Sequence, residues 1–185
     1  MCLVIIVMGV SGAGKSTVAQ ALASALNLRY FDADDFHSDL NKAKMASGVP
    51  LTDADREPWL NSLANAIGQW QNEEQQNEEA KNKEDATEEG ADKRQGAVLA
   101  CSALKESYRQ RLMGDSEAVR LVYLKASYEE IYQRMQQREN HYMKADMLKS
   151  QFATLEEPVD AIVVNASLSI EKIIGQIIAS AKLKM

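Results

Sequence analysis

Near the start of the chain, the apolar run Leu3-Val4-Ile5-Ile6-Val7-Met8 leads into the glycine-rich stretch Gly9-Val10-Ser11-Gly12-Ala13-Gly14-Lys15-Ser16. The second stretch fits the pattern G-x-x-x-x-G-K-[ST], with a strand pattern before it and a helical pattern after it. Glycines allow the backbone to curl so that successive N–H groups point at phosphate oxygens, and the N-terminus of the following helix adds a positive dipole end. The sequence therefore predicts a phosphate-binding P-loop within an α/β fold.

The P-loop also predicts how a nucleotide is held. Lys15 can reach the β- and γ-phosphates of ATP, and the Ser16 hydroxyl can ligate Mg²⁺. We expect ATP contacts from Gly9, Val10, Ser11, Gly12, Ala13, Gly14, Lys15, Ser16 and Thr17, with Lys15 also taking part in catalysis. A P-loop does not choose a reaction, because GTPases, motor ATPases and small-molecule kinases share it.

The rest of the chain alternates short apolar runs with amphipathic stretches, which is typical of a parallel sheet flanked by helices. Five strands are predicted, over residues 3–8, 29–32, 97–101, 120–125 and 161–165. Helices are predicted over 16–26, 58–70, 104–113, 128–138, 147–155 and 169–182. Trp59 and Trp70 recur at helical spacing with Leu63 and Ile67, so we expect both tryptophans in the core rather than at a ligand. A length of 185 residues indicates a single domain.

The net charge of −6 belongs mostly to one segment. Residues 71–95 hold nine acidic and four basic residues and no large apolar side chain. Nothing there can offset the entropy of ordering, so we expect a solvated acidic insertion, either disordered or a frayed extension of the preceding helix. The remaining charges nearly balance, and we expect neither nucleic acid nor a membrane as partner.

Cysteine content and the first apolar run bear on location. Cys2 and Cys101 cannot build a disulfide framework in a chain of this size, which fits a reducing compartment. The apolar run from residue 2 to 8 is too short to span a membrane. We therefore expect the cytoplasm, while the sequence leaves open whether the protein forms a homodimer.

A cluster of carboxylates, Asp32, Asp34 and Asp35, follows the second predicted strand. In an extended chain Asp32 and Asp34 would point to the same side. Asp32 at the strand end could support Mg²⁺ through water near Ser16, and Asp34 could orient or deprotonate an incoming hydroxyl. Helix capping is the alternative interpretation of the cluster, and it is the one we favour for Asp35.

Arg56 precedes Pro58, which suits the first turn of a helix. We expect Arg56 just outside that helix, where its planar guanidinium could bind a carboxylate through two hydrogen bonds. The alternative is a surface ion pair with Asp53 or Asp55.

Several longer motifs run through the chain. They are His37, Lys44-Met45, Gly48-x-Pro50-Leu51-x-Asp53-x-Asp55-Arg56-x-Pro58-Trp59-Leu60, Ala100-Cys101-Ser102-Ala103-Leu104-Lys105-x3-Tyr108-Arg109, His141-x-Met143 and Ser150-Gln151-Phe152-Ala153-x-Leu155-Glu156-x-Pro158. Together these motifs resemble the gluconokinase family of P-loop kinases. The resemblance covers essentially the whole chain except residues 71–95. It implies a nucleoside-monophosphate-kinase-like fold that phosphorylates the 6-hydroxyl of D-gluconate with MgATP.

Gluconate carries a carboxylate at one end and a primary hydroxyl at the other, so the resemblance implies cations for the first and an acidic group for the second. The expected substrate contacts are Asp34, His37, Lys44, Arg56, Lys105, Arg109 and His141. Which cation binds the carboxylate stays open, and His37 could instead be a surface histidine.

The resemblance also implies a mobile lid over about residues 138–147. Arg134 and Arg138 lie four apart on one face of a helix, where they could close over the phosphates and stabilise the transition state. A solvated basic face is the alternative. Asn165 begins the loop that flanks the adenine in this fold.

Some features depart from the family pattern or fit other functions. The strand before Ser102 lacks the aspartate usual in many P-loop enzymes, so Mg²⁺ support is left to Ser16, Asp32 and phosphate oxygens. The alternatives are a kinase for another polyhydroxy acid such as shikimate, or a nucleotide switch that needs neither an acceptor base nor an anion contact.

Overall fold

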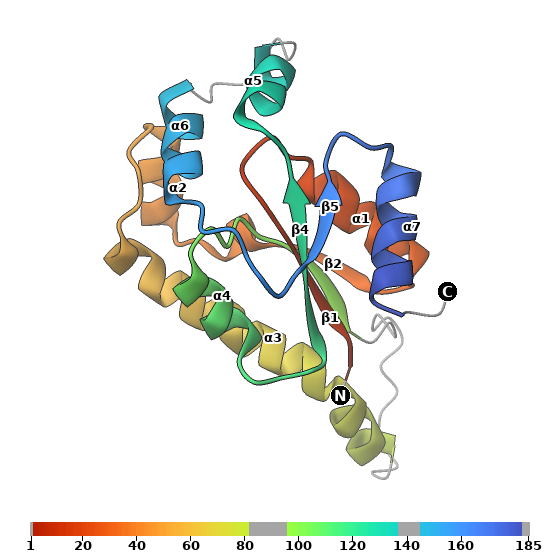
Figure 1. The fold of residues 1–185 in the computed structure, drawn as a ribbon. Helices are drawn as coiled ribbons and strands as arrows, with labels where there is room; N and C mark the ends of the chain where they lie inside the picture. The colour runs from red at the N-terminus through yellow and green to blue at the C-terminus, as the bar shows by residue number, and fades with distance from the viewer. Residues whose placement is uncertain (1, 82–95, 137–144, 183–185) are drawn as a thin grey trace.

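The computed structural model describes residues 2–81, 96–136 and 145–182 (Figure 1). In chain order the elements are β1 (Val4–Met8), α1 (Lys15–Ala25), β2 (Arg29–Asp32), the 3₁₀ helix η1 (Ala33–Phe36), α2 (Asp39–Ala46), α3 (Asp53–Lys81), β3 (Ala97–Ala100), α4 (Glu106–Met113), β4 (Val119–Lys125), α5 (Tyr128–Gln136), α6 (Ala145–Thr154), β5 (Ile162–Asn165) and α7 (Ile170–Ser180). No helix in these ranges is both long and apolar enough to cross a bilayer.

The five strands form one parallel sheet in the order β2-β3-β1-β4-β5. In the central strand, Val4 pairs with Ala97 of β3 on one side and with Val119 of β4 on the other. This sheet confirms the predicted α/β P-loop kinase fold. Because all strands run the same way, the loops that leave their carboxyl ends gather along one edge, where open α/β sheets bind ligands.

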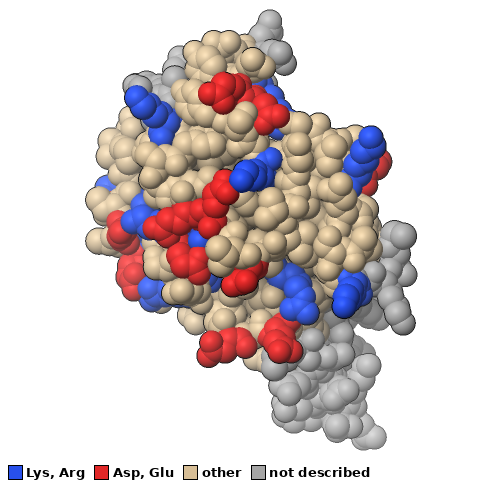
Figure 2. Space-filling model, viewed as in Figure 1, with Lys and Arg blue, Asp and Glu red and all other residues tan. Residues whose placement is uncertain are grey.

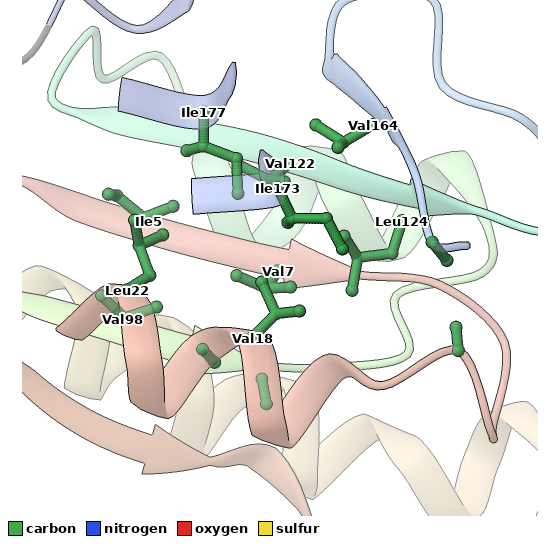
Figure 3. Close-up of a cluster of buried hydrophobic side chains, with 14 of the residues drawn as sticks. Ile5, Val7, Val18, Leu22, Val98, Val122, Leu124, Val164, Ile173 and Ile177 are labelled. Atoms are coloured by element: carbon green, nitrogen blue, oxygen red, sulfur yellow. The ribbon is translucent and has the colours of Figure 1, made fainter. Parts of the chain in front are cut away.

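Both faces of the sheet are covered, which explains why its strands read as continuous apolar runs. Ile5 and Val7 of β1 face α1 and α7, where they pack with the other side chains of Figure 3. The alternate residues Val4, Ile6 and Met8 face α3 and α4. All five β1 side chains are fully buried, so β1 fixes the position of the P-loop that follows it.

Helix α3 begins at Asp53, five residues before the predicted start at Pro58. Thr52 caps it: the Asp55 N–H donates to Thr52 Oγ1 at 3.2 Å, and the Asp55 carboxylate accepts from the Thr52 N–H at 2.9 Å. This reciprocal pair satisfies two free backbone donors at the helix end. Arg56 therefore lies inside the helix, and the prediction that it lies outside is wrong.

The same helix continues to Lys81, into the segment predicted to be a solvated insertion. Gln71 is buried, donates a hydrogen bond to Ser116 Oγ, and accepts the Cys2 N–H through its backbone carbonyl. The prediction of solvation is therefore wrong for Gln71. Residues 82–95 of the predicted insertion lie outside the described residues.

The two tryptophans are in the core, as predicted from their spacing. Trp70 stacks on Phe31 with ring centroids 4.2 Å apart. Trp59 donates from Nε1 to the Ala33 carbonyl oxygen at 2.7 Å, which ties α3 to η1. Helix α3 thus holds the segment after β2 in place at the edge of the sheet.

Candidate active site

A cavity of about 640 Å³ lies at the carboxyl edge of the sheet. It is lined by the P-loop and the start of α1, by Asp32, Asp34 and His37, by Met45, residues 48–51, Arg56 and Trp59, by residues 100–104 with Tyr108, and by Met147, Ser150, Gln151 and Thr154 of α6. Segments far apart in the sequence thus converge on one space, which is large enough for a nucleotide phosphate chain and a small acceptor.

The P-loop contributes backbone amides and a half-buried cation. Gly14 has φ +95°, a conformation that favours glycine, and α1 begins at the next residue. The Lys15 ammonium donates to the Val10 carbonyl oxygen at 3.1 Å and faces the cavity. Burial lowers the pKa of Lys15, while the nearby acidic groups, including Asp34 and Asp32, oppose this change.

The side chain of Asp32 contacts the P-loop. Ser16 Oγ donates to the Asp32 carboxylate at 2.9 Å, and the Tyr30 hydroxyl donates to the same oxygen at 2.9 Å. Within the described residues, no three His, Cys, Asp or Glu side chains converge as a metal cluster. Mg²⁺ at kinase sites takes one or two protein oxygens together with phosphates and waters, so the Ser16 and Asp32 pair fits the donor set that the sequence predicted.

Asp34 reaches the cavity in a different way from the one expected. It lies in η1 rather than in extended chain, and its N–H donates to the Asp32 carboxylate at 3.1 Å, so Asp32 is the cap of this turn. Ser38 caps α2, which makes the capping interpretation of Asp35 wrong. Burial raises the pKa of Asp34, the Asp32 charge raises it further, and Lys15 partly offsets both effects.

His37 forms part of the cavity wall. Its ring stacks on Trp59 with centroids 4.5 Å apart, and only 8% of the residue is exposed. Nδ1 is buried and has no hydrogen-bond partner among the described residues. Burial lowers the pKa of His37, and the positive charges of Arg56 and Lys42 lower it further. A neutral imidazole with an unpaired nitrogen is suited to a ligand hydroxyl.

Arg56 points into the same cavity from the first turns of α3. Its guanidinium donates to the Leu51 carbonyl oxygen at 2.7 Å and lies 6.0 Å from the Tyr108 ring centroid. The Asp53 carboxylate is 3.8 Å away and is already bonded by Lys105 and by the Tyr108 hydroxyl. The predicted surface pair therefore exists but is weak, and the charge of Arg56 stays available to a ligand.

Comparisons with known proteins identify the family to which the chain belongs. Residues 5–159 match a protein-family model described as an AAA domain. The chain is 43% identical to a gluconokinase of Gluconobacter oxydans over 84% of this chain and 76% of that protein. It is 34% identical to the thermoresistant gluconokinase of Escherichia coli over 96% and 92% of the two chains. The chain belongs to the gluconokinase family.

Solved structures point the same way. A gluconokinase from Sinorhizobium meliloti superposes with a TM-score of 0.77 at 32% identity, covering 97% of this chain and 91% of the other. A shikimate kinase from Aquifex aeolicus gives a TM-score of 0.54 at 13% identity, which shows a shared fold alone.

Two lysines predicted as substrate contacts in this gluconokinase-family chain bind acidic neighbours instead. Lys44 pairs with Asp55 at 2.6 Å, and Lys105 pairs with Asp53 at 2.7 Å. Neither lysine is among the residues that line the cavity. Both ion pairs join the start of α3 to its surroundings, so in this structure they position the helix that carries Arg56.

The position of Arg109 in the structure does not fit its predicted role as a substrate contact. The residue is 2% exposed and does not line the cavity. Its guanidinium donates to the carbonyl oxygens of Ala103 and Leu104 at 3.1 and 3.0 Å and to the Glu106 carboxylate. With these donors engaged, Arg109 holds the loop after β3 in shape.

Arg134, predicted to lie over the phosphates, instead contacts the loop after β5. It donates to the Ala166 carbonyl oxygen at 2.9 Å and to Ser167 Oγ at 3.1 Å. Asn165 accepts the Ser167 N–H at 2.7 Å, so both residues support the loop predicted to flank adenine. Arg138 and His141 lie outside the described residues, as does most of the predicted lid.

Tyr108 and Gln151 are among the cavity residues that sequence reasoning did not predict. Both stand in motifs that resemble the family, but neither an isolated tyrosine nor an isolated glutamine signals a chemical role. Gln151 accepts a hydrogen bond from the P-loop residue Ser11, 140 residues away in the sequence. Residue spacing cannot predict a contact of this range.

The placement of Arg109 predicts an effect on stability. Arg109→Met leaves the buried Ala103 carbonyl group without its donor, whereas the Leu104 carbonyl group keeps the Glu156 N–H. One unsatisfied buried carbonyl group costs about 1–3 kcal/mol, so we expect the free energy of unfolding to fall by about that amount. Arg111→Met on the same helix removes an exposed pair with Glu57 and should change it by less than about 0.5 kcal/mol. Urea titrations of both variants measure the difference, and equal small losses would contradict the assignment.

Proposed function

We propose that the protein transfers the γ-phosphoryl group of ATP to the 6-hydroxyl of D-gluconate, giving 6-phospho-D-gluconate and ADP. The observation that carries the proposal is that one cavity is lined by the P-loop, by Asp34 and by Arg56. Phosphate binding, an acceptor base and a carboxylate contact are what this transfer requires. The relatives are named gluconokinases, which supports the same substrate.

The P-loop and Asp32 serve the nucleotide. Backbone amides of the P-loop bind the phosphates, and Lys15 and the N-terminus of α1 provide positive charge beside them. We propose Mg²⁺ as the metal, with Ser16 as a direct ligand and Asp32 acting through water. When bound, Mg²⁺ neutralises charge on the β- and γ-phosphates.

Asp34 serves the acceptor. The 6-hydroxyl oxygen forms the new bond to phosphorus as the bond between phosphorus and the β–γ bridging oxygen breaks, and the hydroxyl proton passes to Asp34. The raised pKa of Asp34 strengthens it as a proton acceptor, and the Lys15 charge partly offsets the rise.

Arg56 and His37 recognise the sugar acid. We assign the gluconate carboxylate to Arg56, because Lys44, Lys105 and Arg109 are bound to protein carboxylates. The unpaired nitrogen of His37 is assigned to a polyol hydroxyl. Contacts from Arg138 and His141, and the catalytic role of Arg134, stay predictions.

The distribution of charge on the surface bears on the kind of partner the protein can bind. On the face shown in Figure 2, acidic and basic side chains lie interspersed rather than grouped by sign. This mixture is consistent with our proposal that the protein does not bind nucleic acid. We also keep the proposals of a cytoplasmic location and of no membrane partner, and we leave the homodimer open.

The substrate proposal is tested by ADP release with MgATP and a panel of acceptors. We expect release to depend on gluconate and to stay near background with shikimate or with no acceptor. Preference for shikimate would favour a kinase of another polyhydroxy acid, and equal release with and without any acceptor would favour a nucleotide switch.

Asp34→Asn should lower kcat by about 10²-fold or more, the scale of general-base loss, with little change in ATP affinity. In the native enzyme, activity should fall as the pH drops through the raised pKa of Asp34. Asp35→Asn removes a negative charge that contributes to raising this pKa, so the acidic limb of kcat/KM should move to lower pH. Normal turnover of Asp34→Asn would remove it from the chemistry.

Arg56→Ala should raise the KM for gluconate by about 10- to 100-fold, the range expected for lost charge-assisted hydrogen bonds, while the KM for ATP stays unchanged. Arg111→Ala, which removes an exposed arginine outside the cavity, is the matched control. An unchanged KM for gluconate in Arg56→Ala would transfer the carboxylate contact to Lys44 or Lys105.

A further inference from the structure

Gln151 of α6 contacts the P-loop and has no role in the function proposed above. Its side-chain oxygen accepts a hydrogen bond from the Ser11 N–H at 2.7 Å, and both residues line the cavity. A backbone N–H can only donate, so the oxygen of the carboxamide, rather than its nitrogen, must face Ser11. This contact therefore fixes the orientation of the Gln151 side chain.

The opposite end of the carboxamide is unused. Among the described residues, Nε2 of Gln151 makes no hydrogen bond. Because the oxygen is occupied, the group can offer a ligand only its two N–H donors. Such donors in a phosphate-binding cavity are suited to the anionic oxygens of a phosphoryl group.

The contact leaves the phosphate cradle open. The backbone N–H groups of Gly14, Lys15 and Ser16 have no hydrogen-bond partner within the described part of the chain. These amides lie at the N-terminus of α1, where phosphate is bound most favourably. Gln151 engages Ser11 earlier in the loop, so it adds donors to the cradle without occupying these amides.

Gln151 is also held firmly in place. Leu148, one turn before it, is fully buried in the core. Beyond the end of α6, the Glu156 N–H donates to the Leu104 carbonyl oxygen at 2.9 Å. On its other side the P-loop packs tightly against α5, because a Cβ atom added to Gly12 would lie only 2.9 Å from Ile131. Groups fixed before the ligand arrives need no reorganisation during the reaction.

We propose that Gln151 is a catalytic residue that donates a hydrogen bond from Nε2 to an oxygen of the γ-phosphoryl group of ATP. The inference rests on the proposed phosphoryl transfer. Anchoring to Ser11 places the donor with the P-loop, whereas Arg56 is bonded to Leu51 and belongs to the acceptor side. This hydrogen bond stabilises the negative charge on the γ-phosphoryl group. ADP has no γ-phosphoryl group, so its binding does not gain from this bond.

The experiment separates this role from that of a structural clip on the P-loop. Gln151→Met keeps the length of the side chain and removes both polar atoms. We expect kcat to fall by about 10²-fold, the effect of losing one aligned donor, and the Kd of a non-hydrolysable ATP analogue to rise by about tenfold while the Kd of ADP changes little. Calorimetric titrations measure both Kd values, and Lys149→Met, an exposed substitution on the same helix, is the control.

A second variant retains the acceptor for Ser11. Gln151→Glu keeps an oxygen for the Ser11 N–H but replaces the donor with a carboxylate oxygen, so we expect weaker binding of the ATP analogue than in Gln151→Met, with ADP less affected. Equal losses for ADP and the ATP analogue in Gln151→Met, or no loss for either, would overturn the proposal. These titrations contain no acceptor, so failure of the native enzyme to phosphorylate gluconate would reject the substrate without touching this result.

Discussion

The parallel pairing of β1 with β3 and β4 is the constraint on which the rest of the molecule depends. The side chains of β1 are completely buried. Parallel pairing brings the carboxyl ends of β1, β3 and β4 to one edge of the sheet. The P-loop leaves from β1, and Asp32 ends β2 beside β3. Helices α5 and α6 lie at the same edge (Figure 1). A slip of one residue in β1 would exchange its two buried faces, and it would move the P-loop relative to the groups that face it.

Electrostatics within this edge divides two carboxylates between two functions. Asp32 accepts hydrogen bonds from Ser16, Tyr30 and the Asp34 N–H. Asp34 is desolvated and lies near that charge, so its own pKa rises. Two neighbouring carboxylates in different environments can therefore take different roles. The Lys15 charge limits the rise of the Asp34 pKa.

The sequence predicted those parts of the fold and site that are local. The P-loop pattern and the five apolar runs needed only periodicity and glycine placement, and both were confirmed. The predicted start of α3 at Pro58 was wrong, because Thr52 and Asp55 form a capping pair that begins the helix before the proline. Arg109 and Gln151 could not be placed from spacing, because burial and long-range hydrogen bonds decide what a long polar side chain does.

Ion pairs beside the cavity bear on the selectivity that we propose for one carboxylate. Lys44 and Lys105 are neutralised by Asp55 and Asp53. Among the described residues that line the cavity, Lys15 and Arg56 are the only lysine and arginine, and we assign Lys15 to the phosphates. A bound sugar acid would thus meet one guanidinium, oriented by the Leu51 carbonyl group. A polyol without a carboxylate would leave that guanidinium unpaired, and the cost of desolvating it would disfavour binding.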